Sequence, residues 1–130
     1  MTQLIDVVRA YFRGIEQGDL DAVLACYWHD ALQIEWPNRL KSKGDRRLVG
    51  QLVADFARGQ RILSSQTYEV QRFAETSDFV MVEVLWKGEL AIPVGKLAPG
   101  DQMIAHSSIA FDFKDERIVS QRNYDCFEEF

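Results

Sequence analysis

The sequence predicts an α+β fold, in which a curved mixed or antiparallel sheet wraps around three N-terminal helices. Apolar residues recur at three- and four-residue spacing in the first half of the chain, which is typical of amphipathic helices. In the second half they alternate with polar residues between turn signals, which is typical of strands. Helices that precede a run of strands indicate an α+β domain. A sheet that curls over its helices leaves a cone-shaped pocket, a place where small molecules bind.

The helices are expected in three segments. An apolar stripe over residues 4–15 predicts the first helix, and Gly18 is a natural stop. Asp19 is a typical N-cap for a short second helix. The residues of this second helix that should face inward are Leu20, Val23, Leu24 and Tyr27. A third helix is expected from about residue 45 to residue 58, with Gly59 as its stop.

The first strand is expected within "DALQIEWP", where Pro37 ends it. Its two phases are Leu32, Ile34 and Trp36 on one side, and Gln33 and Glu35 on the other. The apolar phase should face the core, which places Trp36 inside and makes Glu35 a solvated charge. The later strands are expected near residues 66–74, 79–87, 89–94, 102–113 and 117–127, separated in most cases by the turn signals "ETSD", "KGE", "VGKLAPGD" and "KDE".

Composition narrows the function. The 130 residues are expected to form one domain, 1–130, and the net charge of −5 argues against nucleic-acid binding. No apolar run approaches the roughly 20 residues of a membrane span, and no signal peptide is visible. Cys26 and Cys126 lie far apart, so reduced thiols in a cytoplasmic protein are expected. Since the cysteines and the two histidines, His29 and His106, are scattered, we expect no metal and no cofactor.

Two stretches resemble a known family. "VVRAYFRGIEQGDLDAVLACYWHDALQIEWP" and "FDFKDERIVSQRNYDCF" are similar to the opening and the last strands of the nuclear-transport-factor-2-like superfamily, closest to its SnoaL-like polyketide cyclase branch. The resemblance implies a small-molecule enzyme, a cyclase or isomerase rather than a hydrolase, and a homodimer that forms through the sheet face. The same fold also carries non-catalytic modules that bind ligands or proteins, so this alternative stays open.

By this resemblance, the last strand lines the cone. Gln121, Asn123 and Asp125 would face the pocket, and Tyr124 would face outward with its neighbours in phase. An aspartate in an apolar pocket should have a raised pKa and could act as a general acid or base. The alternative is that Asp125 only accepts backbone N–H groups at a strand end. Asn123, Gln121 and Tyr11 would orient an apolar, carbonyl-containing substrate.

The ketosteroid isomerases of this superfamily offer a partial match. Tyr11 falls where they carry an oxyanion-hole tyrosine, and their general base falls at Glu35 or at Trp36, depending on the alignment. Their second oxyanion acid falls at Ile109, which cannot donate a hydrogen bond, so a true ketosteroid isomerase is disfavoured. An epoxide hydrolase needs an Asp-Arg-Asp constellation, and no inward arginine and second aspartate accompany Asp125.

The remaining candidates concern the pocket lining. His106 is expected on the sheet face away from the pocket or at a dimer interface, and would be a pocket base if the strand phase were reversed. The basic stretch "RLKSKGDRR" is expected to be solvated, or else to attract an anionic ligand at the pocket mouth. Aromatic and soft side chains should make the pocket suit a flat, apolar ligand, with core packing as the alternative for each. The expected substrate-binding residues are Gln121, Trp36, Trp86, Phe56, Tyr27, Met103 and Ser107.

Overall fold

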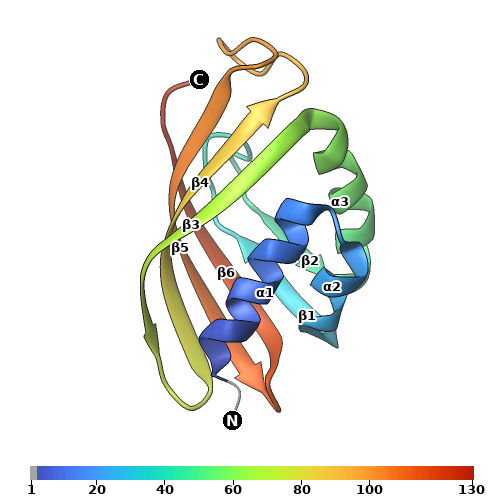
Figure 1. The fold of residues 1–130 in the computed structure, drawn as a ribbon, viewed down its shortest axis with the longest axis vertical. Helices are drawn as coiled ribbons and strands as arrows, with labels where there is room; N and C mark the ends of the chain where they lie inside the picture. Colours follow the sequence, from blue (N-terminus) through green and yellow to red (C-terminus); the bar gives the residue numbers. More distant parts are fainter. Residues whose placement is uncertain (1–2) are drawn as a thin grey trace.

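The computed structural model describes residues 3–130, in which three helices lie against one face of a six-stranded sheet (Figure 1). The helices are α1 (Leu4–Gln17), α2 (Leu20–Ala25) and α3 (Val49–Ile62). The strands are β1 (Tyr27–Glu35), β2 (Asp45–Leu48), β3 (Leu63–Glu75), β4 (Phe79–Leu90), β5 (Gln102–Lys114) and β6 (Arg117–Phe127). This arrangement confirms the predicted α+β class.

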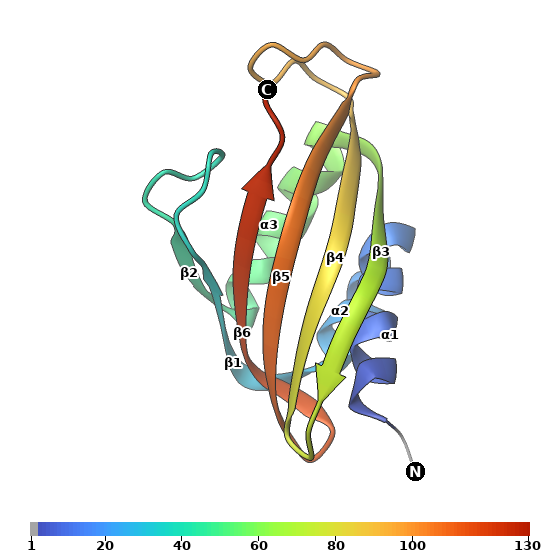
Figure 2. The same cartoon turned by 90° about the vertical axis from the view of Figure 1, so that its left-hand side faces the viewer.

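The sheet has the strand order β2-β1-β6-β5-β4-β3. All neighbours are antiparallel except β1 and β6, which run parallel, so the sheet is mixed. Figure 2 shows the long strands β3–β6 side by side in front, with the three helices behind them. Within residues 3–130, no helix covers the opposite face of these strands. The last strand therefore lies near the middle of the sheet, between β1 and β5.

Local chemistry correctly predicts the end of α1 and the start of α2. Gly18 has φ 68°, the left-handed conformation that ends α1 at little cost for glycine. The Asp19 carboxylate accepts a hydrogen bond from the Ala22 N–H at 3.1 Å and caps α2. The prediction that Tyr27 belongs to the second helix is wrong, because α2 ends at Ala25 and Tyr27 begins β1.

The predicted start of the third helix is also wrong. Asp45–Leu48 form the edge strand β2, which pairs with β1 so that Glu35 lies opposite Asp45 and Leu32 opposite Leu48. The helix α3 begins only at Val49 and continues past the expected stop at Gly59 to Ile62. Pairing with β1 overrides the helical pattern of this segment, and it places Arg47 at the sheet rather than on a helix surface.

The predicted turn "KGE" and the separate strand at residues 89–94 do not exist, since β4 runs unbroken to Leu90. Gly88 has another purpose. A Cβ there would lie 2.6 Å from the Trp86 ring and 2.8 Å from the Leu63 side chain, so only glycine allows the indole to pack over the strand. The loop between β4 and β5 occupies residues 91–101, at the top of Figure 1.

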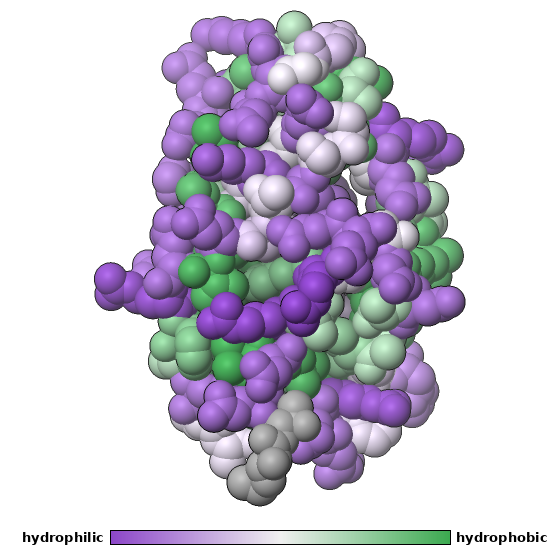
Figure 3. Space-filling model, in the orientation of Figure 1, coloured by the Kyte–Doolittle hydropathy of each residue, from purple (hydrophilic) through white to green (hydrophobic). Residues whose placement is uncertain are grey.

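Most of the core lies between the helices and the sheet. Its fully buried members include Val8, Val80, Val82, Phe111 and Ile118. A smaller cluster of Leu90, Met103 and Phe130 closes the other end of the sheet. Figure 3, a side view with the sheet to the left and the helices to the right, shows a mostly hydrophilic surface with apolar patches between the polar side chains.

Candidate functional site

A cavity of about 180 Å³ opens on the helix-side face of the sheet. Its walls combine two acids, three polar groups and a mostly apolar remainder, drawn from β1, the loop after β1 and the strands β3–β6. The lining residues are Glu35, Leu40, Tyr68, Val84, Trp86, Ala105, Ser107, Ile109, Asn123, Asp125 and Phe127. A mostly apolar hollow with few polar groups is typical of a small-molecule site.

Sheet register brings these groups together from distant parts of the chain. Ser107 lies opposite Asp125, and Val84 lies opposite Ser107, so one row across the sheet ends at this aspartate. In the next row Asn123 has Ile109 on one side and Glu35 on the other. Because alternate residues of a strand point to the same face, both rows project into the cavity.

Of the two acids that line this cavity, Asp125 is the one that has no basic side chain beside it among the described residues. Its Oδ1 accepts a hydrogen bond from the Ser107 hydroxyl at 2.7 Å. No ion pair reaches it within residues 3–130, and burial raises its pKa above the ordinary value. The hydrogen bond from Ser107 opposes this rise, the negative charge of Glu35 adds to it, and the positive charge of Arg47 opposes it. The sequence prediction that Asp125 would lie in a pocket agrees with this geometry, while its catalytic role stays a prediction.

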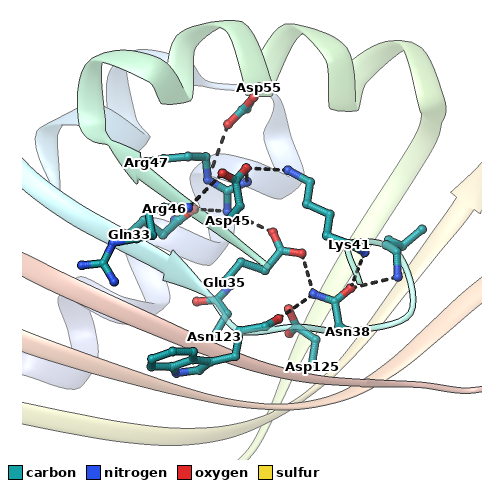
Figure 4. Close-up of polar contacts among 12 residues, drawn as sticks. Gln33, Glu35, Asn38, Lys41, Asp45, Arg46, Arg47, Asp55, Asn123 and Asp125 are labelled. Atoms are coloured by element: carbon teal, nitrogen blue, oxygen red, sulfur yellow. Dashed lines mark hydrogen bonds and ion pairs between the residues drawn. The ribbon is translucent and has the colours of Figure 1, made fainter. Parts of the chain in front are cut away.

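Glu35 and Trp36 exchange the places predicted for them. The Glu35 carboxylate lines the cavity and is bonded on one side to Arg47 at 3.1 Å and on the other to Asn38 at 2.7 Å (Figure 4). Trp36 is 39% exposed and packs against Tyr124 on the other side, with ring centroids 6.2 Å apart. The cause is the pairing of β1 with β6, which sets Glu35 beside Asn123. Alternation of apolar residues along β1 alone cannot reveal this partner.

Arg47 departs from the prediction of a solvated basic loop. Its side chain is only 12% exposed and lies between three carboxylates. The distances are 3.1 Å to Glu35, 3.4 Å to Asp45 and 3.5 Å to Asp55. Its Nη2 also donates to the Gln33 side-chain oxygen at 2.6 Å, while the buried Nε makes no hydrogen bond. A buried guanidinium thus holds β1, β2 and α3 together beside the cavity.

Two aromatic residues of the cavity come from adjacent strands. Trp86 lines it as predicted, and its Nε1 donates to the Gln66 side chain at 3.0 Å. Tyr68, which the sequence reasoning missed, lies opposite Trp86 in the register. Burial raises the pKa of Tyr68 well above its ordinary value, so the phenol stays protonated and can donate a hydrogen bond. The sequence signal for Tyr68 is the alternation in residues 67–70, where Tyr68 and Val70 share the apolar phase.

A second cavity of about 220 Å³ lies between the helices and the sheet. Tyr11 and Phe56 line it, as do Gln33, Arg47 and Gln66. Two contacts join the walls of the two cavities, because Arg47 bonds to Glu35 and Gln66 bonds to Trp86. Tyr11 and Phe56 are thus separated from the cavity that holds Asp125.

Four residues expected to bind substrate lie outside both cavities. Gln121 and Tyr27 are 0% and 4% exposed and belong to a buried hydrogen-bond chain. Met103 is buried in the small cluster with Leu90, and Trp36 lies on the opposite face of the sheet. Ser107 alone among the non-aromatic candidates of that group lines the cavity with Asp125.

The histidines do not take part in the site. His106 lies on the outer face, as predicted, and its Nε2 is 2.7 Å from a carboxylate oxygen of Glu128. His29 is exposed on β1. Within the described part of the chain, no three or more His, Cys, Asp or Glu side chains are grouped so that they could hold a metal ion. No helix between residues 3 and 130 is long and apolar enough to cross a membrane.

Comparison with known proteins identifies the family. Residues 8–121 match the model of the SnoaL-like domain, so the chain belongs to the SnoaL-like family and the resemblance seen in the sequence is confirmed. No protein with a curated description matches it.

Solved structures share the fold at low sequence identity. IdmH, a candidate polyketide cyclase from Streptomyces antibioticus, has 19% identity and a TM-score of 0.80, over 95% of this chain and 92% of that one. A candidate polyketide cyclase from Xanthomonas campestris has 21% identity and a TM-score of 0.75, over 93% and 88%. A nuclear-transport-factor-2-like protein of unknown function from Burkholderia pseudomallei has 15% identity and a TM-score of 0.77, over 96% and 92%. At these identities the likeness shows the fold alone.

Proposed function

We propose that this SnoaL-like protein is a small-molecule enzyme of the cyclase or isomerase type, with Asp125 as its general acid and base. The observation that carries the proposal is the state of Asp125. Its carboxyl lines a largely apolar cavity, accepts a hydrogen bond from Ser107 and from no other side chain of residues 3–130, and has a pKa raised by burial. A raised pKa brings a carboxyl closer to neutral pH, where it can both accept and return a proton.

The proposed substrate is a small, mainly apolar ketone. In the first step the Asp125 carboxylate takes a proton from the carbon next to the carbonyl. The C–H bond breaks, an O–H bond forms on Asp125, and the electron pair moves to the carbonyl oxygen as an enolate. In an isomerisation, Asp125 then returns the proton to another carbon of the substrate. In a cyclisation, the enolate carbon forms a C–C bond to a second carbonyl carbon, the π bond of that carbonyl breaks, and its oxygen takes the proton back from Asp125 as a hydroxyl. Two hydrogen-bond donors in the same cavity, the Asn123 amide and the protonated phenol of Tyr68, are available to stabilise the enolate oxygen.

The family supports this proposal without naming the reaction. Two proteins that share the fold are candidate polyketide cyclases, and an enolate is the nucleophile that closing a carbon ring onto a carbonyl requires in the step proposed above. A cavity of about 180 Å³ is below the usual range of roughly 300–1,000 Å³, which favours a compact substrate. The homodimer through the outer sheet face and the cytoplasmic location stay predictions that follow from the resemblance and the composition.

A direct test needs no knowledge of the natural substrate. We expect the wild type to accelerate the exchange of the α-protons of 1-indanone, a small flat ketone, in D₂O, as followed by proton NMR. Asp125→Asn should reduce this acceleration by about 100-fold or more, since general-base catalysis contributes that much. Asp112→Asn, on the opposite face of the sheet, is the control and should exchange like the wild type.

The outcome separates the two functions left open by the sequence. If 1-indanone binds, as judged by a thermal shift, and its protons do not exchange faster than in buffer, the proposal of an enolising enzyme fails. The protein is then a ligand-binding module of the same fold. If exchange is fast in the wild type and equally fast in Asp125→Asn, another group is the base and Asp125 is structural.

A further inference from the structure

We infer that Arg47 fixes the direction of a series of hydrogen bonds, called the hydrogen-bond chain below, that runs through buried side chains to Asn123. The chain turns the Asn123 amide so that its N–H group faces the cavity, and the cavity therefore selects ligands with an acceptor oxygen. This inference rests on the proposed function in one respect, since it names the chemical class of ligand for the same cavity. It assigns Arg47, Gln33 and Tyr27 as positioning residues, none of which reaches the cavity that holds Asp125.

The chain begins at a group that can only donate. An arginine guanidinium has no acceptor, so the Arg47 Nη2 contact at 2.6 Å requires the oxygen of the Gln33 amide. The nitrogen of the same amide must then point the other way. It donates to the Tyr27 hydroxyl at 3.3 Å. The orientation of the Gln33 amide is therefore fixed by Arg47.

The next two links transmit this direction. Because the Tyr27 oxygen accepts from Gln33, its proton is free to donate, and it donates to the Gln121 side-chain oxygen. The Gln121 nitrogen is then turned toward Asn123, where it donates to Oδ1 at 3.0 Å, and toward the Tyr11 hydroxyl at 3.3 Å. Burial raises the pKa of Tyr27 well above its ordinary value, so this link keeps its proton.

The chain ends at the wall of the cavity. With Oδ1 of Asn123 occupied by Gln121, the Nδ2 group is the end of the amide left for a ligand. Gln121 is 0% exposed, so solvent cannot offer it alternative partners that would reverse the chain. Asn123 and Asp125 lie two residues apart on one face of β6. A ketone can therefore place its oxygen at Asn123 and its α-carbon toward Asp125.

A single isosteric change should reverse this polarity. In Gln33→Glu, the introduced carboxylate has no donor, so Tyr27 must donate to it and accept from Gln121 instead. The Gln121 oxygen is then turned toward Asn123, whose Nδ2 must donate to it, leaving Oδ1 for the cavity. Every link remains satisfied, which makes reversal rather than unfolding the expected result.

Side-chain NMR reports the reversal directly. The protein contains two asparagines, Asn38 and Asn123, so selective ¹⁵N labelling of asparagine gives the signals of two side-chain carboxamide groups. Asn38 Nδ2 is bonded to Glu35 at 2.7 Å and to the Trp36 carbonyl at 2.9 Å, and serves as an internal reference with slow exchange. In the wild type the Asn123 carboxamide protons should exchange rapidly with water. In Gln33→Glu one of them should become protected.

Ligand preference gives the second readout. Adding 1-indanone, whose carbonyl only accepts, should shift the Asn123 carboxamide resonances of the wild type. Gln33→Glu should weaken binding of 1-indanone by about tenfold, the value of one good hydrogen bond, without weakening binding of the N–H donor indole. Gln66→Glu is a matched control. The Gln66 side-chain oxygen already accepts a hydrogen bond from Trp86, so a glutamate can keep this bond, and the substitution adds the same negative charge outside the hydrogen-bond chain. It should leave the ratio of the two affinities unchanged.

These results are independent of catalysis. An unchanged Asn123 carboxamide in Gln33→Glu, with or without ligand, overturns the inference even if α-proton exchange confirms Asp125 as the base. Conversely, a reversed Asn123 amide in Gln33→Glu, with no α-proton exchange in the wild type, supports the hydrogen-bond chain and refutes the proposal of an enolising enzyme. Should Gln33→Glu fail to fold, Tyr27→Phe removes the central link. The wild-type preference for 1-indanone over indole must then fall toward equality, and its persistence would refute the chain.

Discussion

The two faces of the sheet at β6 each carry a serine, an aspartate and an arginine, and the two sets are arranged differently. On the outer face, Arg122 Nη1 contacts the Asp112 carboxylate at 2.6 Å, and the Ser120 hydroxyl donates to the same carboxylate. Burial alone would raise the pKa of Asp112, but the hydrogen bonds from Arg122 and Ser120 outweigh it and lower the pKa. In this cluster the negative charge of Asp112 is balanced by the positive charge of Arg122.

On the inner face the arginine is turned away from the aspartate. Arg47 is bonded to Glu35 and Gln33, and in the described part of the chain the Asp125 carboxylate accepts a side-chain hydrogen bond from Ser107 alone. The pKa of Asp125 is consequently raised, where that of Asp112 is lowered. Polarity in a strand is therefore a poor guide to function, and what marks the inner face is an acid left without its counter-charge.

The largest expected difference between the two faces is in stability. Arg47→Met should lower the free energy of unfolding by about 3 kcal/mol or more, because it leaves Glu35 buried without a cation. Arg122→Met makes the same change in a pair whose side chains are 27% and 39% exposed, and should cost about 1 kcal/mol or less. Urea unfolding of both variants measures the contrast. Equal costs would mean that the inner network is no more demanding than a surface pair.

The second difference is in the pH dependence of stability. Asp125 has a folded pKa above its ordinary value of 3.8, so its favourable contribution is complete below that pH and is lost as pH rises through the folded pKa. Asp112 has a lowered pKa, so its contribution is complete above 3.8 and is lost as pH falls through the folded pKa. Each aspartate thus makes its contribution on the opposite side of 3.8.

Replacing either aspartate with asparagine removes its titration. The difference from the wild type then shows whether that aspartate stabilises the fold more at low pH or at high pH. As pH rises from 3 to 7, the Tm of Asp125→Asn should increase relative to the wild type, and that of Asp112→Asn should decrease. Thermal unfolding at a series of pH values tests this divergence. Parallel curves for the two variants would show that the inner carboxyl is as well compensated as the outer one, and the central argument for an active site would be lost.

Local sequence signals predicted a large part of the fold. The stop at Gly18, the cap at Asp19 and the long strands β5 and β6 follow from backbone preference and period-two alternation, which depend on near neighbours in the chain. The phase of β6, with Asn123 and Asp125 toward the cavity, came from the family resemblance, because its own alternation is polar on both sides.

The two errors that most affect the site share one physical cause, which is pairing with a distant strand. The phase of β1 depends on its parallel partner β6, and it moved Glu35 into the cavity and Trp36 out of it. Pairing with β1 likewise turned a helical-looking segment into β2 and delivered Arg47 to the interior. Neither pairing can be read from a short window of sequence. Together the two pairings place Glu35 at the cavity and Arg47 beside it.

The smallest expected difference concerns the two serines. Ser107→Ala removes the hydrogen bond that favours the charged form of Asp125, so the pKa of Asp125 should rise further, at a cost of about 1 kcal/mol or less in stability. Ser120→Ala removes the equivalent bond to Asp112, whose carboxylate still contacts Arg122, so its pKa should stay below 3.8.

Carboxyl ¹³C NMR titration of both variants measures these two pKa values. If Asp125 acts as a base, the acidic limb of the pH profile for 1-indanone exchange should move to higher pH in Ser107→Ala by the same amount as the titration. A shift in the titration without a shift in the profile would mean that the group limiting exchange is not Asp125. The serine thus distinguishes a carboxyl that is merely perturbed from one that carries the proton.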